Sequence, residues 1–166
     1  MFLPAERFTH TSRLQAAWNV IRAEGQTLPG GEFCPWPETA LHDGGWSVYG
    51  LFAAGRAILA NCVFCPETTK LLQHLPGVTN AGFSRLAAGS RIRPHTGYAG
   101  TVLRLHLGLV VPPGCGLRVG TETRSWREGH CLLFDDKIDH EAWNGGDGDR
   151  LILLVDFQPD TDKAPS

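Results

Sequence analysis

Two histidines stand within one stretch of the chain, from Pro94 to Arg150, and they could bind a metal ion together. His95 and His140 are 45 residues apart, and each lies at the edge of a strand-like run. Neutral imidazoles are common ligands of transition metals, and distant positions of a β-barrel can meet at its open end. The pair therefore predicts a two-histidine metal site. The alternative for each residue is a surface histidine or a hydrogen-bonded core histidine.

A single arginine closes the same stretch and could anchor an anion. Arg150 opens the apolar run Leu151–Val155, where burial of a guanidinium without an anionic partner is costly. A ligand carboxylate would match the guanidinium fork in a bidentate way. The alternative is an arginine at a strand end whose head reaches water.

Between these residues runs a strictly alternating segment, Leu103–Leu109. Side chains two apart share a face of a strand, so the leucines take one face, and Arg104 and His106 take the other. This pattern predicts the polar wall of a pocket, or an amphipathic strand with a solvated polar face. Asp135 and Asp136 precede His140 by five and four residues; they could orient an imidazole or lie in a solvated turn.

The elements that must position these residues are mostly short strands. Runs rich in β-branched, aromatic and leucine residues, separated by glycine and proline, predict strands at 46–53, 58–64, 82–86, 103–111, 116–119, 131–134, 141–143 and 151–157. Helices are expected over Ser12–Glu24, where Ser12 and Gln15 form a capping-box pattern, and over Pro66–Leu75. The fold class is therefore mainly β: an antiparallel barrel or sandwich with one or two flanking helices. Among such folds the jelly roll, as in cupin-like proteins, routinely holds metals at its open end.

Length and composition set limits on function. The 166 residues fit a single domain over 1–166. A net charge of −2 lacks the positive field that nucleic-acid binding needs, so no nucleic-acid partner is expected. The start resembles no secretory signal and no apolar run is long enough to cross a bilayer, so we expect a cytoplasmic protein with no membrane partner. The oligomeric state stays open.

Five cysteines, an odd number, favour reduced thiols over a disulfide framework. Cys62 and Cys65 form a CxxC motif without a second pair to complete a zinc site, so both are expected to be structural. Because Cys65 directly precedes the predicted helix at Pro66, a lowered thiol pKa is the alternative.

Several sequence blocks resemble the catalytic domain of aspartyl/asparaginyl β-hydroxylases, in order over roughly 80–159. They are 94–97 (PHTG), 103–109 (LRLHLGL), 122–126 (ETRSW), 134–136 (FDD), 140–143 (HEAW) and 150–152 (RLI). The resemblance implies a double-stranded β-helix that binds Fe(II) and 2-oxoglutarate and uses O₂. It also implies hydroxylation of a C–H bond, typically the β-carbon of an Asp/Asn-like amino acid, with release of succinate and CO₂.

Carried over by position, the resemblance gives roles to single residues. His95 and His140 match the iron ligands, which makes them catalytic. Most oxygenases of the wider class carry a carboxylate two residues after the first histidine, where this chain has Gly97. The subfamily is known to lack that carboxylate, so the resemblance implies two histidine ligands with water in the third position.

The remaining roles concern the cosubstrate. Arg150 matches the arginine that pairs with the distal carboxylate of 2-oxoglutarate, and Ser84 and His106 match residues that line the same pocket. Arg104 matches a catalytic or binding residue that meets an acidic group of the cosubstrate or substrate. Val102 stands where the animal enzymes carry a further arginine.

Two questions remain open from the sequence. The substrate could be peptidyl, free or carrier-tethered, because specificity depends on the loops at the barrel mouth. The alternative function is a non-catalytic cupin-like module that binds a small carboxylate through Arg104, His106 and Arg150, and Gly97 is the residue that keeps this alternative open.

Overall fold

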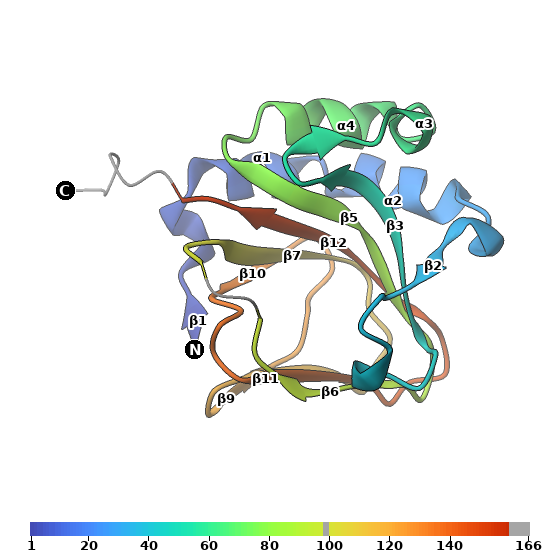
Figure 1. Ribbon diagram of the computed structural model, residues 1–166, viewed down its shortest axis with the longest axis vertical. Helices are drawn as coiled ribbons and strands as arrows, with labels where there is room; N and C mark the ends of the chain where they lie inside the picture. The colour runs from blue at the N-terminus through green and yellow to red at the C-terminus, as the bar shows by residue number, and fades with distance from the viewer. Residues whose placement is uncertain (98–99, 160–166) are drawn as a thin grey trace.

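The computed structural model describes residues 1–97 and 100–159, and two antiparallel sheets that face each other dominate it (Figure 1). The larger sheet has the order β1-β10-β7-β12-β5-β3-β2, with β4 paired to β3. Its strands are β1 (Phe2–Leu3), β2 (Cys34–Pro35), β3 (Trp46–Ala53), β4 (Arg56–Ala57), β5 (Val78–Leu86), β7 (Leu103–Val110), β10 (Cys131–Phe134) and β12 (Arg150–Phe157). The smaller sheet has the order β6-β11-β8-β9. Its strands are β6 (Arg91–His95), β8 (Cys115–Val119), β9 (Glu122–Arg124) and β11 (His140–Asn144). The predicted jelly roll is confirmed.

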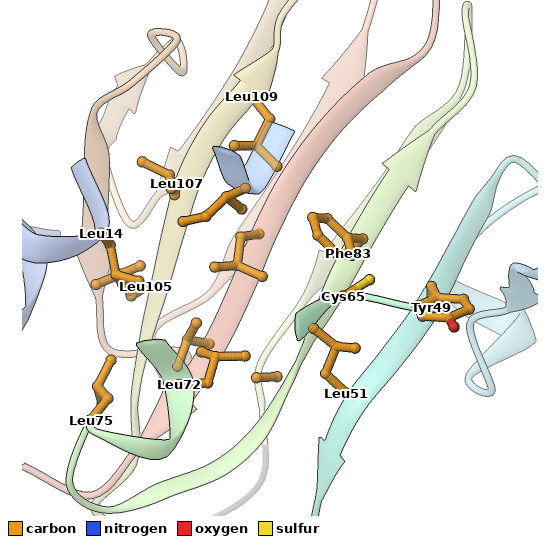
Figure 2. Packing of buried hydrophobic residues seen from close by; sticks show 14 of the residues in the cluster. Leu14, Tyr49, Leu51, Cys65, Leu72, Leu75, Phe83, Leu105, Leu107 and Leu109 are labelled. Carbon is orange, nitrogen blue, oxygen red and sulfur yellow. The ribbon is translucent and has the colours of Figure 1, made fainter. Parts of the chain in front are cut away.

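Helices cover the outer face of the larger sheet (Figure 1). They are α1 (Thr9–Ala16), α2 (Trp18–Thr27), α3 (Leu59–Cys62) and α4 (Pro66–Gln73), with short 3₁₀ turns η1 (Ala5–Arg7), η2 (Gly30–Glu32) and η3 (Thr39–Leu41). Figure 2 shows the core between helices and sheet, where Leu14 and Leu72 of the helices meet Leu105 and Leu107 of β7. Full burial of each such leucine contributes roughly 1.5–3 kcal/mol. This layer therefore fixes the position of the sheet that carries the polar residues on its other face.

A second core lies between the two sheets. It joins Trp46, Leu86, Phe134 and Ile152 of the larger sheet to side chains of the smaller sheet, Ile92, Leu117, Val119 and Ala142. The two cores on opposite faces of the larger sheet explain the alternation along β7. Its leucines point to the helices, and Arg104 and His106 point between the sheets, where they line cavities. The predicted pocket wall is therefore right, and the solvated-face alternative is wrong.

The first predicted helix differs in detail from the structure. It consists of two helices, because the backbone breaks at Ala17, with φ −100° and ψ 10°. The capping-box interpretation is wrong: Ser12 lies inside α1 and its hydroxyl donates to the carbonyl of Thr9. Gln15 instead accepts a hydrogen bond from the backbone N–H of Cys131 at 2.9 Å, which ties α1 to β10.

The strand predicted over 58–64 is also wrong, because this segment forms α3. Asn61 donates a side-chain hydrogen bond to the carbonyl of Gly50 at 2.8 Å, and these tertiary contacts outweigh β-propensity in a short apolar run. The part of the chain that the structure describes thus has four α-helices, more than the one or two predicted. The second predicted helix is confirmed as α4, and the short strands β1, β2, β4, β6 and β9 were not predicted.

Cys62 and Cys65 are buried, and their thiols are free. Burial, with Glu24 and Cys62 nearby, raises the pKa of Cys65 to about 12. The alternative that the helix N-terminus lowers the pKa of the Cys65 thiol is therefore wrong. Desolvation of the thiolate raises the pKa by more than the helix lowers it. No helix within the described ranges is long and apolar enough to cross a membrane.

Candidate metal and carboxylate site

The two histidines meet between neighbouring strands of the smaller sheet. His95 ends β6, His140 begins β11, and the two residues are register partners in this strand pair. Their ring centroids lie 4.3 Å apart, with the ring planes inclined at 54°. The structure therefore brings together the two metal ligands predicted from the sequence.

Backbone carbonyls set the tautomer of both rings. Nδ1 of His95 lies 2.6 Å from the carbonyl oxygen of Arg93, and Nδ1 of His140 lies 2.8 Å from that of Ile138. A carbonyl oxygen only accepts, so each Nδ1 carries a proton, and in the neutral form of each ring the lone pair lies on Nε2. Burial, together with His95 and Arg104, lowers the pKa of His140 to about 4, so this ring is neutral at pH 7. Imidazoles that bind through Nε2 suit a divalent transition metal.

Among the described residues, no third protein ligand lies with the two histidines. Within residues 1–97 and 100–159, no group of three or more His, Cys, Asp or Glu side chains is arranged to hold a metal ion. A Cβ atom placed on Gly97 would collide with the carboxylate of Asp136, and the backbone N–H of Gly97 donates to the carbonyl oxygen of Asp136 at 2.7 Å. Asp136 therefore occupies the space that a side chain at position 97 would need.

The backbone orients the two imidazoles, a role that the sequence analysis considered for Asp135 and Asp136. Both Nδ1 atoms bind carbonyl oxygens, as described above. Asp135 pairs with Lys137 at 2.8 Å in the turn before β11. Burial raises the pKa of Asp136, while Arg104, 3.8 Å away, opposes the shift.

Arg150 is buried between the sheets, with 1% of its surface exposed. One guanidinium nitrogen donates to the hydroxyl oxygen of Ser84 at 3.1 Å, and the guanidinium carbon lies 4.5 Å from the centre of the Trp126 ring. Its Nε is buried and has no hydrogen-bond partner among the described residues. Burial lowers the pKa of Arg150 to about 9, so the side chain still carries its charge at pH 7. The alternative of an arginine that reaches water is wrong.

His106 presents a second buried donor. The indole N–H of Trp126 donates to Nδ1 of His106 at 3.1 Å, so the proton of the neutral ring resides on Nε2. Burial, followed by the charges of Arg104 and Arg150, lowers the pKa of His106 well below its usual value, which keeps the ring neutral. The Nε2–H is buried and has no acceptor among the described residues.

Ser84 provides a third donor beside them. Its hydroxyl oxygen accepts hydrogen bonds from the indole of Trp46 at 2.9 Å and from Arg150. Both lone pairs are thereby used, and the hydroxyl hydrogen remains free to donate. Ser84, His106 and Arg150 line one narrow cavity of about 20 Å³, together with His95 and His140. Glu141 also lines this cavity, but no described carboxylate interacts with Arg150. The three hydrogen-bond donors therefore make this a site for an anion such as a carboxylate.

Arg104 faces the same interior but is already paired. Its Nε and Nη2 donate to the two carboxylate oxygens of Asp156 at 2.8 and 2.9 Å. These contacts and Asp136 raise the pKa of Arg104 against the opposing effect of burial. Arg104 also lines a second, larger cavity of about 490 Å³.

Three residues of this site were missed from the sequence: Trp46, Trp126 and Asp156. Asp156 gave a usable signal, because it lies six residues after Arg150 in β12 and so on the same face of the strand. Trp126 lay inside a block of the resemblance, but nothing in the sequence shows that its ring contacts both Arg150 and His106.

Fold and site together define a class: a cupin-like jelly roll with two histidines and a buried arginine between its sheets. The sequence model of the family described as "Aspartyl/Asparaginyl beta-hydroxylase" matches residues 15–159. The chain belongs to this family.

Curated relatives agree with this assignment. Human aspartyl/asparaginyl beta-hydroxylase is 38% identical over 152 residues, which are 86% of this chain and 20% of the human protein. The ornithine lipid ester-linked acyl 2-hydroxylase of Rhizobium tropici is 40% identical over 123 residues, which are 72% of this chain and 44% of that protein. The chain thus spans only part of the length of these relatives.

Solved structures support the fold alone. A predicted oxalate decarboxylase from Thermotoga maritima has a TM-score of 0.53 at 12% identity, over 80% of this chain and 99% of that one. An HTH_3 family transcriptional regulator from Vibrio cholerae has a TM-score of 0.52 at 12% identity, over 83% of this chain and 62% of that one.

Proposed function

We propose that the chain is an Fe(II)- and 2-oxoglutarate-dependent dioxygenase that hydroxylates a C–H bond of an amino-acid-like substrate. The observation that carries the proposal is the pair of buried donors without acceptors, Arg150 Nε and His106 Nε2, in the cavity that also holds the two histidines. A ligand carboxylate would satisfy both donors. Membership of a hydroxylase family supports the same reaction class.

The residues present fit a bound iron ion. His95 and His140 would hold it through Nε2, because their Nδ1 protons are engaged by backbone carbonyls. When bound, iron supplies the activation of O₂ that protein side chains cannot perform. Because Asp136 fills the space beside Gly97, the described residues offer two protein ligands, His95 and His140. The cosubstrate and water would complete the coordination of the iron.

The residues also fit one end of 2-oxoglutarate. Arg150, His106 and Ser84 would orient its distal carboxylate, and Trp126 would hold the two larger donors in place. Because the cavity is narrow, its side chains must move apart to admit the five-carbon diacid. In the overall reaction one oxygen atom of O₂ enters the substrate C–H bond as a hydroxyl group. The other enters succinate as 2-oxoglutarate loses CO₂.

The test uses purified protein with Fe(II), 2-oxoglutarate and a panel of amino-acid-like substrates. Succinate should form in step with a substrate product that has gained one oxygen atom. His95→Ala and His140→Ala should each weaken iron binding, measured by calorimetry under anaerobic conditions. His74→Ala, which changes an exposed histidine, is the matched control. Iron binding by both site variants as tight as that of the unaltered protein would show that the metal site is misplaced.

A second candidate function is a non-catalytic module that binds a small carboxylate. This function is favoured because the hydrogen-bond donors of Arg150, His106 and Ser84 could bind a carboxylate without a metal. Calorimetry of 2-oxoglutarate binding with and without iron separates the two functions. Equal affinity in both conditions, with no succinate from any substrate, would favour the module.

A further inference from the structure

The hydroxyl of Ser84, one of the three donors of the carboxylate site, is held by the indole of Trp46. The indole N–H donates to Oγ of Ser84 at 2.9 Å, and Arg150 donates to the same oxygen at 3.1 Å. An oxygen that accepts two hydrogen bonds can direct its own hydrogen only along the remaining direction. The orientation of the Trp46 ring therefore decides where Ser84 can donate.

The ring of Trp46 is fixed in turn by the ring of Trp36, which directly follows β2. The two rings are stacked, with their centroids 4.1 Å apart and their planes inclined at 6°. The backbone N–H of Trp36 also donates to the carbonyl oxygen of Trp46 at 2.9 Å. The indole N–H of Trp36 is buried and has no acceptor among the described residues, so Trp36 contributes the face of its ring here.

His42 contacts both tryptophans and is buried, with 7% of its surface exposed. Nε2 of His42 lies 2.9 Å from the carbonyl oxygen of Trp36, and Nδ1 accepts a hydrogen bond from the backbone N–H of Gly44 at 3.0 Å. A carbonyl oxygen only accepts and an N–H only donates, so the proton of this ring lies on Nε2. The His42 ring meets the Trp46 ring edge to face, at a centroid distance of 6.0 Å and an angle of 80°. His42 therefore holds the stacked pair from its own side of the chain.

The backbone around His42 has a separate contact, with the strand that carries His95. His42 forms an isolated antiparallel bridge with Ile92 of β6. A guanidinium nitrogen of Arg93, also in β6, donates to the carbonyl oxygen of Ala40. The backbone thus holds this segment against β6, whereas the imidazole ring contacts the tryptophans. A substitution of the side chain at position 42 can therefore leave the strand with the metal ligand in place.

We propose that His42 is a positioning residue for the carboxylate site. Its ring acts through the stacked tryptophans on Ser84 and favours the orientation in which the Ser84 hydroxyl donates to the ligand carboxylate. The inference rests on the proposed function and deepens it, because the ligand in question is 2-oxoglutarate. His42 itself contacts neither the cosubstrate nor the metal ligands in this arrangement.

Two amide substitutions separate the two hydrogen bonds of His42. The side-chain oxygen of Asn can accept from the backbone N–H two residues further on, here that of Gly44, but Asn is too short to reach Trp36. Gln is long enough to donate to the carbonyl oxygen of Trp36. The proposal therefore requires His42→Gln to bind 2-oxoglutarate more tightly than His42→Asn. A role in stability alone should make the two variants alike, because each loses one hydrogen bond.

Calorimetry of 2-oxoglutarate binding to the metal-free protein measures the effect. We expect His42→Asn to weaken the affinity on the order of fivefold, as for the loss of one buried hydrogen bond, and His42→Gln by less than about twofold. His74→Asn, at an exposed histidine, is the control and should leave the affinity unchanged. Fe(II) affinity, titrated under anaerobic conditions, should stay the same in all three variants. Equal effects of Asn and Gln, or a parallel loss of iron affinity, would overturn the proposal.

A Trp46→Phe background tests the route by which His42 acts. This substitution keeps an aromatic ring in the stack but removes the N–H that binds Ser84, so His42→Asn should have no further effect on affinity there. Losses of affinity that multiply in the double variant would show that His42 acts by another route, and would overturn the inference while the proposed function stands. No binding of 2-oxoglutarate by the unaltered protein, with or without Fe(II), would overturn the proposed function and the inference with it.

A variant of Trp36 tests the same route if His42→Asn does not fold. Trp36→Leu removes the stacked ring but keeps the carbonyl oxygen that His42 contacts. It should weaken 2-oxoglutarate binding at least as much as is expected for His42→Asn. Unchanged affinity in Trp36→Leu would overturn the inference, because the stack would then play no part in orienting Ser84.

Discussion

The indole N–H of Trp126 donates a hydrogen bond to Nδ1 of His106 over 3.1 Å. The same indole lies against the guanidinium of Arg150, 4.5 Å from its carbon. One side chain therefore fixes the tautomer of a histidine and supports the arginine that donates a hydrogen bond to Ser84. Two of the three donors proposed to hold the cosubstrate, His106 and Arg150, therefore depend on Trp126.

Trp126→Phe should weaken 2-oxoglutarate binding about tenfold, equivalent to about 1.4 kcal/mol. The substitution keeps an aromatic ring against Arg150 but removes the N–H, so the His106 proton is free to move to Nδ1. The measurement is calorimetry with anaerobic Fe(II) protein. Trp143→Phe, on the smaller sheet beside Arg91, should leave affinity unchanged. Unchanged affinity in Trp126→Phe would show that the tautomer is set in another way.

Arg150→Met should stabilise the free protein while it abolishes 2-oxoglutarate binding. A buried guanidinium without a carboxylate is costly, and an apolar side chain of similar length removes the cost of the unsatisfied Nε donor, about 1–3 kcal/mol. We expect a gain of about 1 kcal/mol in the free energy of unfolding, measured in urea, because Ser84 and Trp126 offset part of the cost. Arg91→Met, at an exposed position, is the control. A loss of stability would mean that these contacts already compensate the buried charge.

The alternation of apolar and polar residues along single strands allowed us to predict which side chains share a face. It placed Arg104 and His106 on the interior face of β7, and it placed the leucines of the same strand against the helices. The pairing of His95 with His140 was likewise expected from two histidines at strand edges. Neither conclusion needed the register between distant strands.

The partners of these residues could not be predicted, because they depend on that register. Asp156 pairs with Arg104 because β12 lies antiparallel to β7 with these two residues opposite each other. The helix at 59–62 was missed for a related reason: a short apolar run fits either state, and hydrogen bonds to β3 decide it. Arg104 is therefore already paired with a carboxylate of the protein itself, which the sequence alone did not indicate.

Metal-free protein should lose stability as the pH falls from 6.5 toward 4. The pKa of His140 is about 4 in the folded protein and near 6.5 when unfolded, so the unfolded state binds the proton first and stability falls through this window. The full shift corresponds to about 3 kcal/mol, and the lowered pKa of His106 adds to the same trend. In urea titrations, His140→Gln should flatten the pH dependence. His74→Gln, at an exposed histidine, should not, and identical curves for both variants would contradict the shift.

A carboxylate restored at position 97 should be tolerated only after Asp136 is removed. A side chain at Gly97 would collide with the Asp136 carboxylate, so Gly97→Asp should destabilise the fold by about 1–3 kcal/mol. Gly97→Asp with Asp136→Gly should recover that loss and bind Fe(II) more tightly than the unaltered chain, because a third protein ligand becomes available. Gly31→Asp controls for the added charge, because a Cβ added at Gly31 would meet no atom beyond its chain neighbours within 4 Å. Chemical denaturation and anaerobic iron titration measure the two effects. If the single variant were as stable as the Gly31 control, Asp136 would not be the residue that keeps position 97 a glycine.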